Sequence, residues 1–301
     1  MNRKELIAEL RAHGLSRVYG KSLSRASKKE LESHHRFLET GRGLRYFSAS
    51  QMKTFLTCGL RYYFRYIEGV RTPPGWYMTL GSSVDTAVTL SYEMKIQTGR
   101  DTPVDVATDM FAEDLKARAE ETDWKESDQP TVERYGVEMV KVFADQVQPI
   151  REPVRTQHSH LVQFEAGTGY GYYGIRDADM AGDEVVDLKT STRAQKAEDL
   201  RDDFQLNGYA ISYLDELGTL PSVGHDTLLR NKKGTEFGWD HCRFTPAQDA
   251  QLRFLKMLAM VADAVHKGIF LPPAPTSMQY YRKICSPESC GMYERCHAEV
   301  L

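Results

Sequence analysis

The stretch GDEVVDLKTSTRAQ at 182–195 restricts the possible folds of this chain more than any other feature. Val185 and Val186 indicate a short buried strand, and Asp187 and Lys189 follow at its end. Because side chains alternate along a strand, the carboxylate and the ammonium group project from the same face of a sheet. An exposed ion pair is the simplest interpretation of a bare D-x-K, so its meaning depends on the surrounding sequence.

A second carboxylate precedes this pair by ten residues. Asp177 lies in GIRDADM, on the preceding strand of a predicted hairpin, and adjacent antiparallel strands would bring it close to Asp187. The two carboxylates repel one another unless a divalent cation neutralises them, and hard oxygen ligands suit Mg²⁺ or Mn²⁺. Lys189 could then orient an attacking water or stabilise charge on phosphorus. Asp179 is an alternative ligand, although a surface acid is the simpler interpretation.

A helix predicted at 202–217 adds two polar side chains. Gln205 and Tyr209 are four residues apart in DDFQLNGYA and therefore share one helical face. Both can donate hydrogen bonds to a phosphate or to the sugar edge of a bound strand. The sequence thus predicts a polar helix face close to the carboxylates.

The order of predicted elements indicates an α/β fold. Helical patterns at 47–68, 78–98 and 103–149 precede the strands, and a long helix is predicted at 246–267. We expect an α/β core with helices wrapped around it, with helical N-terminal and middle additions and a C-terminal cysteine cluster. The predicted organisation is a basic helical segment (1–46) and one domain (47–301), comprising a helical insertion (about 100–155), an α/β core (about 156–245) and a C-terminal helix with the cysteines (246–301).

The charge distribution is more informative than the net charge of −3. Residues 1–45 contain eleven Lys or Arg against five Glu, whereas residues 101–128 contain ten acidic residues against three basic ones. A basic segment can bind phosphate backbones, and an acidic helix commonly keeps a surface solvated. The sequence lacks an apolar run near the roughly 20 residues that a membrane span requires. We therefore expect a cytoplasmic protein, of a bacterium or a phage-infected host cell, without a membrane partner.

The motifs together resemble a known family. G-x-x-D at 174–177, D-x-K-T at 187–190 and Q-x-x-x-Y at 205–209 are similar to the PD-(D/E)xK nuclease superfamily, specifically its RecB-type branch. FSASQMKTFLTCGLRYYFRYIEGV (47–70) and LGSSVDTAV (80–88) resemble the N-terminal helices of that branch. The likeness spans most of residues 47–296 and implies a restriction-endonuclease-like core, in which a mixed central sheet is flanked by helices.

The resemblance also implies roles for individual residues. Asp177 and Asp187 would hold the metal, and Lys189 would be the catalytic lysine, while Gln205 and Tyr209 would contact the nucleic-acid strand. The family usually has a histidine in the metal shell after the first L-G-x-x-V, where this chain has Asp85. A carboxylate is also a hard ligand, so we expect a working site with altered metal preference; loss of activity is the alternative.

Four of the five cysteines provide a second signal. Cys285, Cys290 and Cys296 form C-x4-C-x5-C, and Cys58 precedes them by more than 200 residues. This arrangement resembles the iron–sulfur staple of AddB-type and CRISPR-adaptation nucleases, which implies a 4Fe-4S cluster. Zinc is the alternative, with His297 as a substitute ligand. The fifth cysteine, Cys242, is predicted to be a core residue.

The predicted activity is metal-dependent hydrolysis of DNA by an exonuclease acting on ends or single strands, in recombination, repair or phage DNA processing. Arg61 and Arg65 could contact DNA phosphates, and a helicase or recombination protein could be a partner. Two other interpretations stay open. One is a catalytically impaired DNA-binding subunit of a helicase or integration complex, and the other is a zinc-stapled interaction protein.

Overall fold

The computed structural model describes residues 2–12, 17–18, 21–22, 24, 28, 31–32, 45–163, 170–273 and 283–300. The basic segment predicted at 1–46 lies largely outside these residues. Its described elements are helix α1 (Arg3–Ala12) and the short strands β1 (Arg17–Val18) and β2 (Lys21–Ser22), which pair antiparallel. Across the described residues, none of the helices is both long and apolar enough to cross a membrane.

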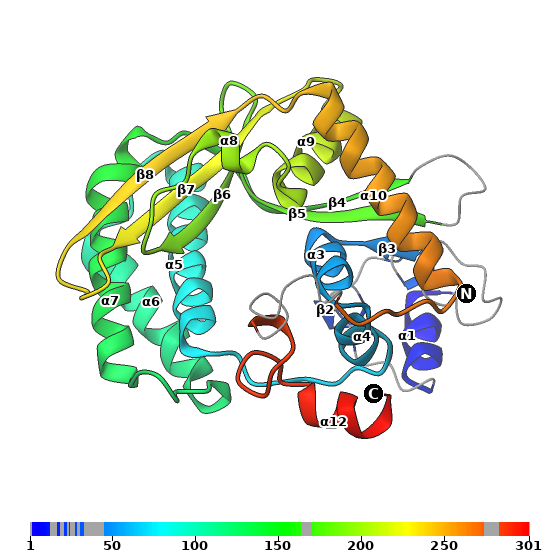
Figure 1. Cartoon of the computed structure of the whole chain (residues 1–301). Coiled ribbons are helices and arrows are strands. Elements are labelled where there is room, and N and C mark those ends of the chain that lie inside the picture. The colour runs from blue at the N-terminus through cyan, green and yellow to red at the C-terminus, as the bar shows by residue number, and fades with distance from the viewer. Residues whose placement is uncertain are drawn as a thin grey trace.

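Within the described residues, a mixed sheet of six strands occupies the centre of the molecule (Figure 1). Its longest strands, β4 and β5, pair antiparallel, and the other edge of β5 is shared by β3 at its start and β6 at its end. β6 and β7 run parallel, and β8 pairs antiparallel with β7. The strands are β3 (Arg45–Phe47), β4 (Pro153–Gln163), β5 (Tyr170–Met180), β6 (Glu184–Ser191), β7 (Ser222–Arg230) and β8 (Phe237–Phe244).

Helices cover both faces of the sheet, α5 to α7 on one side and α3, α4, α9 and α10 on the other (Figure 1). The α-helices with the sheet are α3 (Ala49–Thr57), α4 (Gly59–Tyr62), α5 (Trp76–Thr98), α6 (Val104–Arg118), α7 (Gln129–Val142), α8 (Ala197–Leu200), α9 (Phe204–Leu217), α10 (Gln248–His266) and α12 (Tyr293–Glu299). Shorter π and 3-10 turns extend some of them: η1 (Tyr63–Ile67), η2 (Ala119–Glu121), η3 (Phe143–Val147) and η4 (Gln148–Ile150).

Side-chain alternation divides the apolar residues of the sheet between these two layers. Val186 and Leu228 pack with α5, α6 and α7, whereas Val185 and Val223 pack under α9. Cys242 belongs to the core under α9, so its prediction as a core residue is confirmed. The fold class predicted from the sequence, a mixed sheet flanked by helices, is confirmed as well.

Local sequence signals set the ends of the helices that carry polar groups. Asp203 caps α9 by accepting hydrogen bonds from the backbone N–H groups of Gln205 and Leu206, at 2.7 and 3.0 Å. The helix ends at Gly218, which has a φ of 74°, a conformation that glycine adopts without steric cost. These two ends fix where α9 begins and ends, and hence where its polar side chains lie along the sheet.

The β4–β5 hairpin is irregular at one point. Thr156 pairs with Ala178 and His158 with Arg176, but Gln157 and Asp177 between them are not paired, and Gln157 has a φ of 46°. Arg176 contacts α9, and regular alternation would put Ala178 on that same face, yet Ala178 packs with α5. The alternation is thus broken at Asp177, and such irregularities commonly redirect a side chain next to a functional site.

Candidate active site

The polar residues predicted from the sequence meet where β5, β6 and α9 come together. Asp177 lies on β5, Asp187 and Lys189 lie on β6, and Gln205 and Tyr209 lie on the first turns of α9. The antiparallel pairing of Ala178 with Val186 puts the two aspartates opposite one another, as the hairpin prediction required. The structure therefore brings these five side chains into one cluster.

Tyr209 links the two aspartates. Its hydroxyl lies 3.3 Å from Asp177 Oδ1 and 3.2 Å from Asp187 Oδ1, and Gln205 Nε2 donates to Asp187 Oδ1 at 2.6 Å and to the Tyr209 hydroxyl at 2.8 Å. The other oxygen of Asp177 accepts the backbone N–H of Leu188 at 3.2 Å. Tyr209 is only 2% exposed, so α9 holds both carboxylates in fixed positions within a nearly dry environment.

Lys189 completes the cluster. Its ammonium group forms an ion pair with Asp187 Oδ2 and lies 3.4 Å from Gln205 Oε1. Burial acts to lower the pKa of Lys189, but the charge and hydrogen bond of Asp187 outweigh it, so the pKa is raised from its usual value. Lys189 is consequently a permanent cation at neutral pH. An orienting or charge-stabilising role suits it better than that of a general base.

Asp85, on α5, adds a third carboxylate. It lines a small hollow together with Asp177 and Leu188, and it is partly buried. Burial, reinforced by the charge of Asp187, raises the pKa of Asp85 to about 6. Burial and the charges of Asp187 and Asp85 likewise raise the pKa of Asp177 well above its usual value.

The raised pKa values of Asp85 and Asp177 mean that ionising these carboxyl groups costs free energy, and the neighbouring protein groups alone do not remove this cost. Lys189 supplies one positive charge against three carboxylates, and a divalent cation would supply the charge that is lacking. The donor set, carboxylate oxygens from three elements, is what Mg²⁺ and Mn²⁺ prefer. The residues present therefore fit a hard divalent cation.

His225 is a member of the site that sequence reasoning missed. It is 2% exposed, and its Nε2 lies 3.4 Å from Asp187 Oδ2. Its Nδ1 contacts Gln195 Oε1, in the loop after β6. The parallel register of β6 and β7 puts His225 beside Asp187, and the imidazole can thus fix the orientation of that carboxylate.

Other candidates lie elsewhere. Asp179 is not the surface acid that the sequence suggested: it is 2% exposed and paired with Arg176 and Arg155.

Arg61 donates to the carbonyls of Ile284 and Ser289 at 2.7 and 3.3 Å, which ties it to the C-terminal segment. Arg65 lies with its guanidinium 5.4 Å from the ring centre of Tyr66. A DNA contact by either arginine stays a prediction.

The four cysteines of the predicted cluster gather around one small hollow, which Arg61 and His297 also line. Cys58 lies between α3 and α4, and its sulfur accepts the backbone N–H of Arg61 at 3.4 Å. Burial raises the pKa of the Cys296 thiol, and the other three thiols raise it further. Within the described part of the chain, no three of these sulfurs all lie within 4.8 Å of one another.

The mixed sheet and the carboxylate–lysine cluster fit the class of nucleases. The family model of the PD-(D/E)XK nuclease superfamily matches residues 46–297, and the chain belongs to this superfamily. Its members generally use Mg²⁺ or Mn²⁺ and act on DNA. The family match does not distinguish the RecB-type branch from others, and it does not test the iron–sulfur cluster that the motifs suggested.

A solved structure is similar over nearly the whole chain. It is a crystal structure from Eubacterium rectale named "Putative exonuclease", with 15% sequence identity, a TM-score of 0.55, and coverage of 92% of this chain and 94% of that one. At this identity the likeness concerns the fold alone; together with the family match, the mixed sheet flanked by helices is consistent with a restriction-endonuclease-like fold. No curated protein matches the chain.

Proposed function

We propose that this chain is a divalent-metal-dependent deoxyribonuclease of the RecB-type branch that degrades DNA from an end. One observation carries the proposal: Asp177 and Asp187 lie opposite one another on β5 and β6, and the Lys189 ammonium group is paired with Asp187. Asp85 of α5 lines a small hollow together with Asp177. The name of the structural neighbour supports an exonuclease over an endonuclease. In the cell, we propose a role in recombination, repair or phage DNA processing, with a helicase or recombination protein as partner. We also propose that the chain consists of a basic segment (1–46) and a nuclease domain (47–301).

The side chains divide the chemistry among them. Asp85, Asp177 and Asp187 would hold Mg²⁺ or Mn²⁺, which when bound supplies Lewis-acid activation of the phosphodiester. Lys189 orients the attacking water and stabilises negative charge that develops on the phosphate oxygens. Gln205 and Tyr209 keep the carboxylates aligned through their hydrogen bonds and offer donors to the bound strand.

Asp85 gives this site one more negative charge than a histidine at that position would give. The additional carboxylate strengthens the attraction for a hard dication and weakens the preference for softer metals. We therefore expect an active enzyme in which Mg²⁺ competes well with Mn²⁺. An impaired DNA-binding subunit is the alternative that the same substitution allows.

The test is degradation of end-labelled linear DNA and of closed circular DNA, each single- and double-stranded, with Mg²⁺, Mn²⁺ or EDTA. Lys189→Ala is the active-site variant, and Lys196→Ala, an exposed lysine in the following loop, is the matched control. We expect metal-dependent loss of linear DNA by the wild type and by Lys196→Ala. The rate for Lys189→Ala should fall by about 100-fold or more, since a preorganised charge at a developing anion contributes at least that much.

Three outcomes would reject parts of the proposal. Cleavage of circular DNA at the same rate as linear DNA would identify an endonuclease instead of an exonuclease. Intact DNA under every condition, with retained DNA binding, would favour the impaired subunit. Full activity of Lys189→Ala would remove the catalytic assignment of this lysine.

We further propose that Cys58, Cys285, Cys290 and Cys296 bind a 4Fe-4S cluster. Thiolates on a single zinc, with Zn–S bonds of about 2.3 Å, lie only about 4 Å apart. The wider spacing of these sulfurs supports a larger group, because no three of them, all in described segments, lie within 4.8 Å of one another. Such a cluster would join α3 and α4 to the C-terminal segment, beside the ion pair between Arg295 and Glu68 at 2.6 Å.

Anaerobic purification of the wild type and of Cys290→Ser tests this assignment, with Cys242→Ser as the control thiol. We expect brown wild-type and Cys242→Ser proteins with about four iron atoms each, and a colourless Cys290→Ser protein of lower melting temperature. One equivalent of zinc and no iron in the wild type would support the zinc alternative. A melting temperature that is the same in the Cys290→Ser protein would argue that no staple exists.

A further inference from the structure

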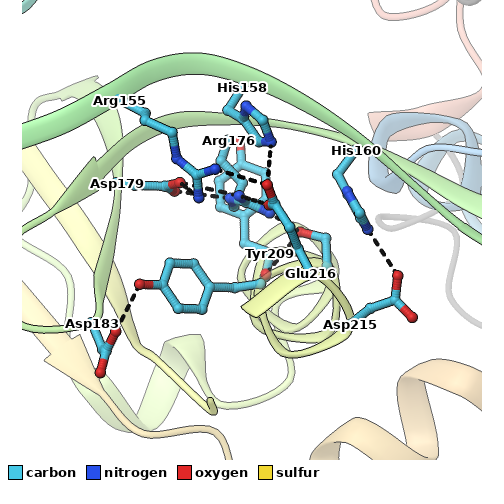
Figure 2. A network of polar contacts seen from close by, with 11 residues as sticks. Arg155, His158, His160, Arg176, Asp179, Asp183, Tyr209, Asp215 and Glu216 are labelled. Atoms are coloured by element: carbon cyan, nitrogen blue, oxygen red, sulfur yellow. Dashed lines mark hydrogen bonds and ion pairs between the residues drawn. The ribbon is translucent and has the colours of Figure 1, made fainter. Parts of the chain in front are cut away.

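We propose that β4 and the C-terminal end of α9 form a second metal site, which binds Zn²⁺ or a similar borderline transition-metal ion and lies apart from the catalytic carboxylates. His158, His160 and Glu216 each offer one ligand atom, and these three atoms all lie within 4.8 Å of one another. Figure 2 shows the two imidazoles on the strand pointing towards the carboxylates at the end of the helix. Two imidazoles and a carboxylate are a common ligand set of zinc.

The β-strand geometry explains the pair of histidines. His158 and His160 are two residues apart on β4, so they project from the same face of the sheet. Their partners on β5 are Arg176 and Gly174, and that face is covered by α9. Glu216 and Asp215 lie on the last turn of α9, so their carboxylates contact the imidazoles from the face of the sheet that α9 covers.

Glu216 is held in position by its own neighbours. The guanidinium of Arg176, which is fully buried, donates to Glu216 Oε2, Asp179 and Ser212. The other oxygen, Oε1, lies 3.0 Å from His158 Nε2 and accepts a hydrogen bond from Arg155 at 2.7 Å. Partners that orient a ligand carboxylate in this way are typical of built metal sites.

A fourth ligand lies next to His160. Asp215 Oδ2 is 2.9 Å from His160 Nε2, and its side chain is 49% exposed, so it can turn towards an ion without losing a buried contact. With Asp215, the site would offer two nitrogens and two oxygens, the number of ligands that zinc takes in tetrahedral coordination.

The charges nearby permit a dication. Arg155 and Arg176 carry two positive charges, and Asp179, Asp215 and Glu216 carry three negative ones. An ion at Glu216 Oε1 displaces one hydrogen bond from Arg155, which keeps its ion pair with Asp179 at 2.7 Å.

The ligand chemistry separates this site from the catalytic one. Mg²⁺ favours oxygen ligands alone, whereas imidazole favours zinc, nickel and copper. Glu216 follows Tyr209 by two helical turns, about 10 Å along α9. An ion here would clamp the end of α9 to β4 and thereby stabilise the helix that also carries Gln205 and Tyr209.

The test compares metal content and stability in variants that keep every cysteine and every catalytic carboxylate. Wild-type protein, the double variant His158→Ala/His160→Ala and the control Ser159→Ala are equilibrated with Zn²⁺, desalted and analysed for zinc. Ser159 lies between the two histidines and is exposed. We expect the double variant to hold about one equivalent of zinc less than the wild type and Ser159→Ala.

A second readout keeps the result interpretable if the double variant folds poorly. In His160→Gln, a partly exposed position, the amide can still contact Asp215 but cannot coordinate zinc well. Adding Zn²⁺ should raise the melting temperature of wild type and Ser159→Ala by several degrees more than that of His160→Gln. Equal zinc content and equal melting shifts in all the proteins would overturn the proposal.

Discussion

At the scale of single residues, His241 is a half-buried charge with a predictable effect on stability. Its Nδ1 lies 2.7 Å from Asp226 Oδ1, and its Nε2 lies 3.2 Å from Glu184 Oε1. These two hydrogen bonds raise the pKa of His241 to about 9. Because an unfolded histidine has a pKa near 6.5, the proton stabilises the fold fully below about pH 6.5, and this stabilisation is lost as the pH rises through about 9.

The corresponding variant is His241→Gln. We expect it to be less stable than the wild type by up to about 3 kcal/mol at pH 6, since a pKa difference near two units corresponds to that order of free energy. The deficit should shrink towards pH 9.5, where the wild-type imidazole is also neutral. Urea unfolding of both proteins at pH 6, 7.5 and 9.5 measures it. A deficit that is constant over this range would contradict the assigned protonation.

Residue-scale prediction from sequence succeeded where spacing and alternation carry the information. Asp177, Asp187 and Lys189 belong to one hairpin, and Gln205 and Tyr209 share one helix face, so short-range geometry was enough to group each set. His225 was missed because its contact with Asp187 depends on the parallel pairing of β6 with β7, and α9 separates these strands in the chain. No local pattern encodes that register.

At the scale of elements, the seating of α9 on β5 connects packing with chemistry. Gly208 lies between Gln205 and Tyr209 in sequence, and a Cβ there would be 2.2 Å from the hydroxyl of Tyr172. Tyr172 is 1% exposed and cannot swing away. Gly208→Ala should thus push α9 off the sheet, with a loss of about 1–3 kcal/mol of stability, the usual cost of overpacking.

The same substitution should lower the rate of DNA cleavage even where the variant stays folded, because α9 carries the two side chains that align the carboxylates. Urea unfolding and DNA cleavage at 25 °C, where the variant stays folded, separate these effects. Gly238→Ala is the control, since a Cβ at Gly238 meets no atom within 4 Å. Equal activity of the Gly208→Ala and Gly238→Ala proteins would show that α9 tolerates the displacement.

Elements were predictable where their signals are local. The helix expected at 78–98 is α5 (Trp76–Thr98), which ends at Gly99 with a φ of 68°. The first long strand, expected from 158, begins at Pro153, because pairing with β5 extends it beyond its own apolar alternation. The break at Gln157 and Asp177 was not predictable, since it arises from contacts with α5 and α9 on opposite faces.

At the scale of the whole molecule, the β7–β8 hairpin forms a positively charged tip far along the sheet from the cysteines. Arg134, Arg230, Lys232 and Lys233 gather there, and within the described residues none has a carboxylate oxygen within the 4.0 Å of an ion pair. Arg230 stacks over the rings of Tyr135 and Trp76, at 4.7 and 5.4 Å. Unneutralised cations beside aromatic rings favour a nucleic-acid strand.

If the chain is a nuclease, this tip should contribute to DNA affinity through the phosphates. Lys232→Glu/Lys233→Glu should weaken binding to single-stranded DNA and reduce the slope of log affinity against log salt by about 1.4, since each phosphate contact contributes about 0.7. Fluorescence anisotropy with Ca²⁺ in place of Mg²⁺ measures binding without cleavage. Lys256→Glu/Lys267→Glu, two exposed lysines of the α10 region, changes the net charge equally and is the control. Equal loss of affinity in both double variants would mean that overall charge, and not the hairpin tip, governs DNA binding.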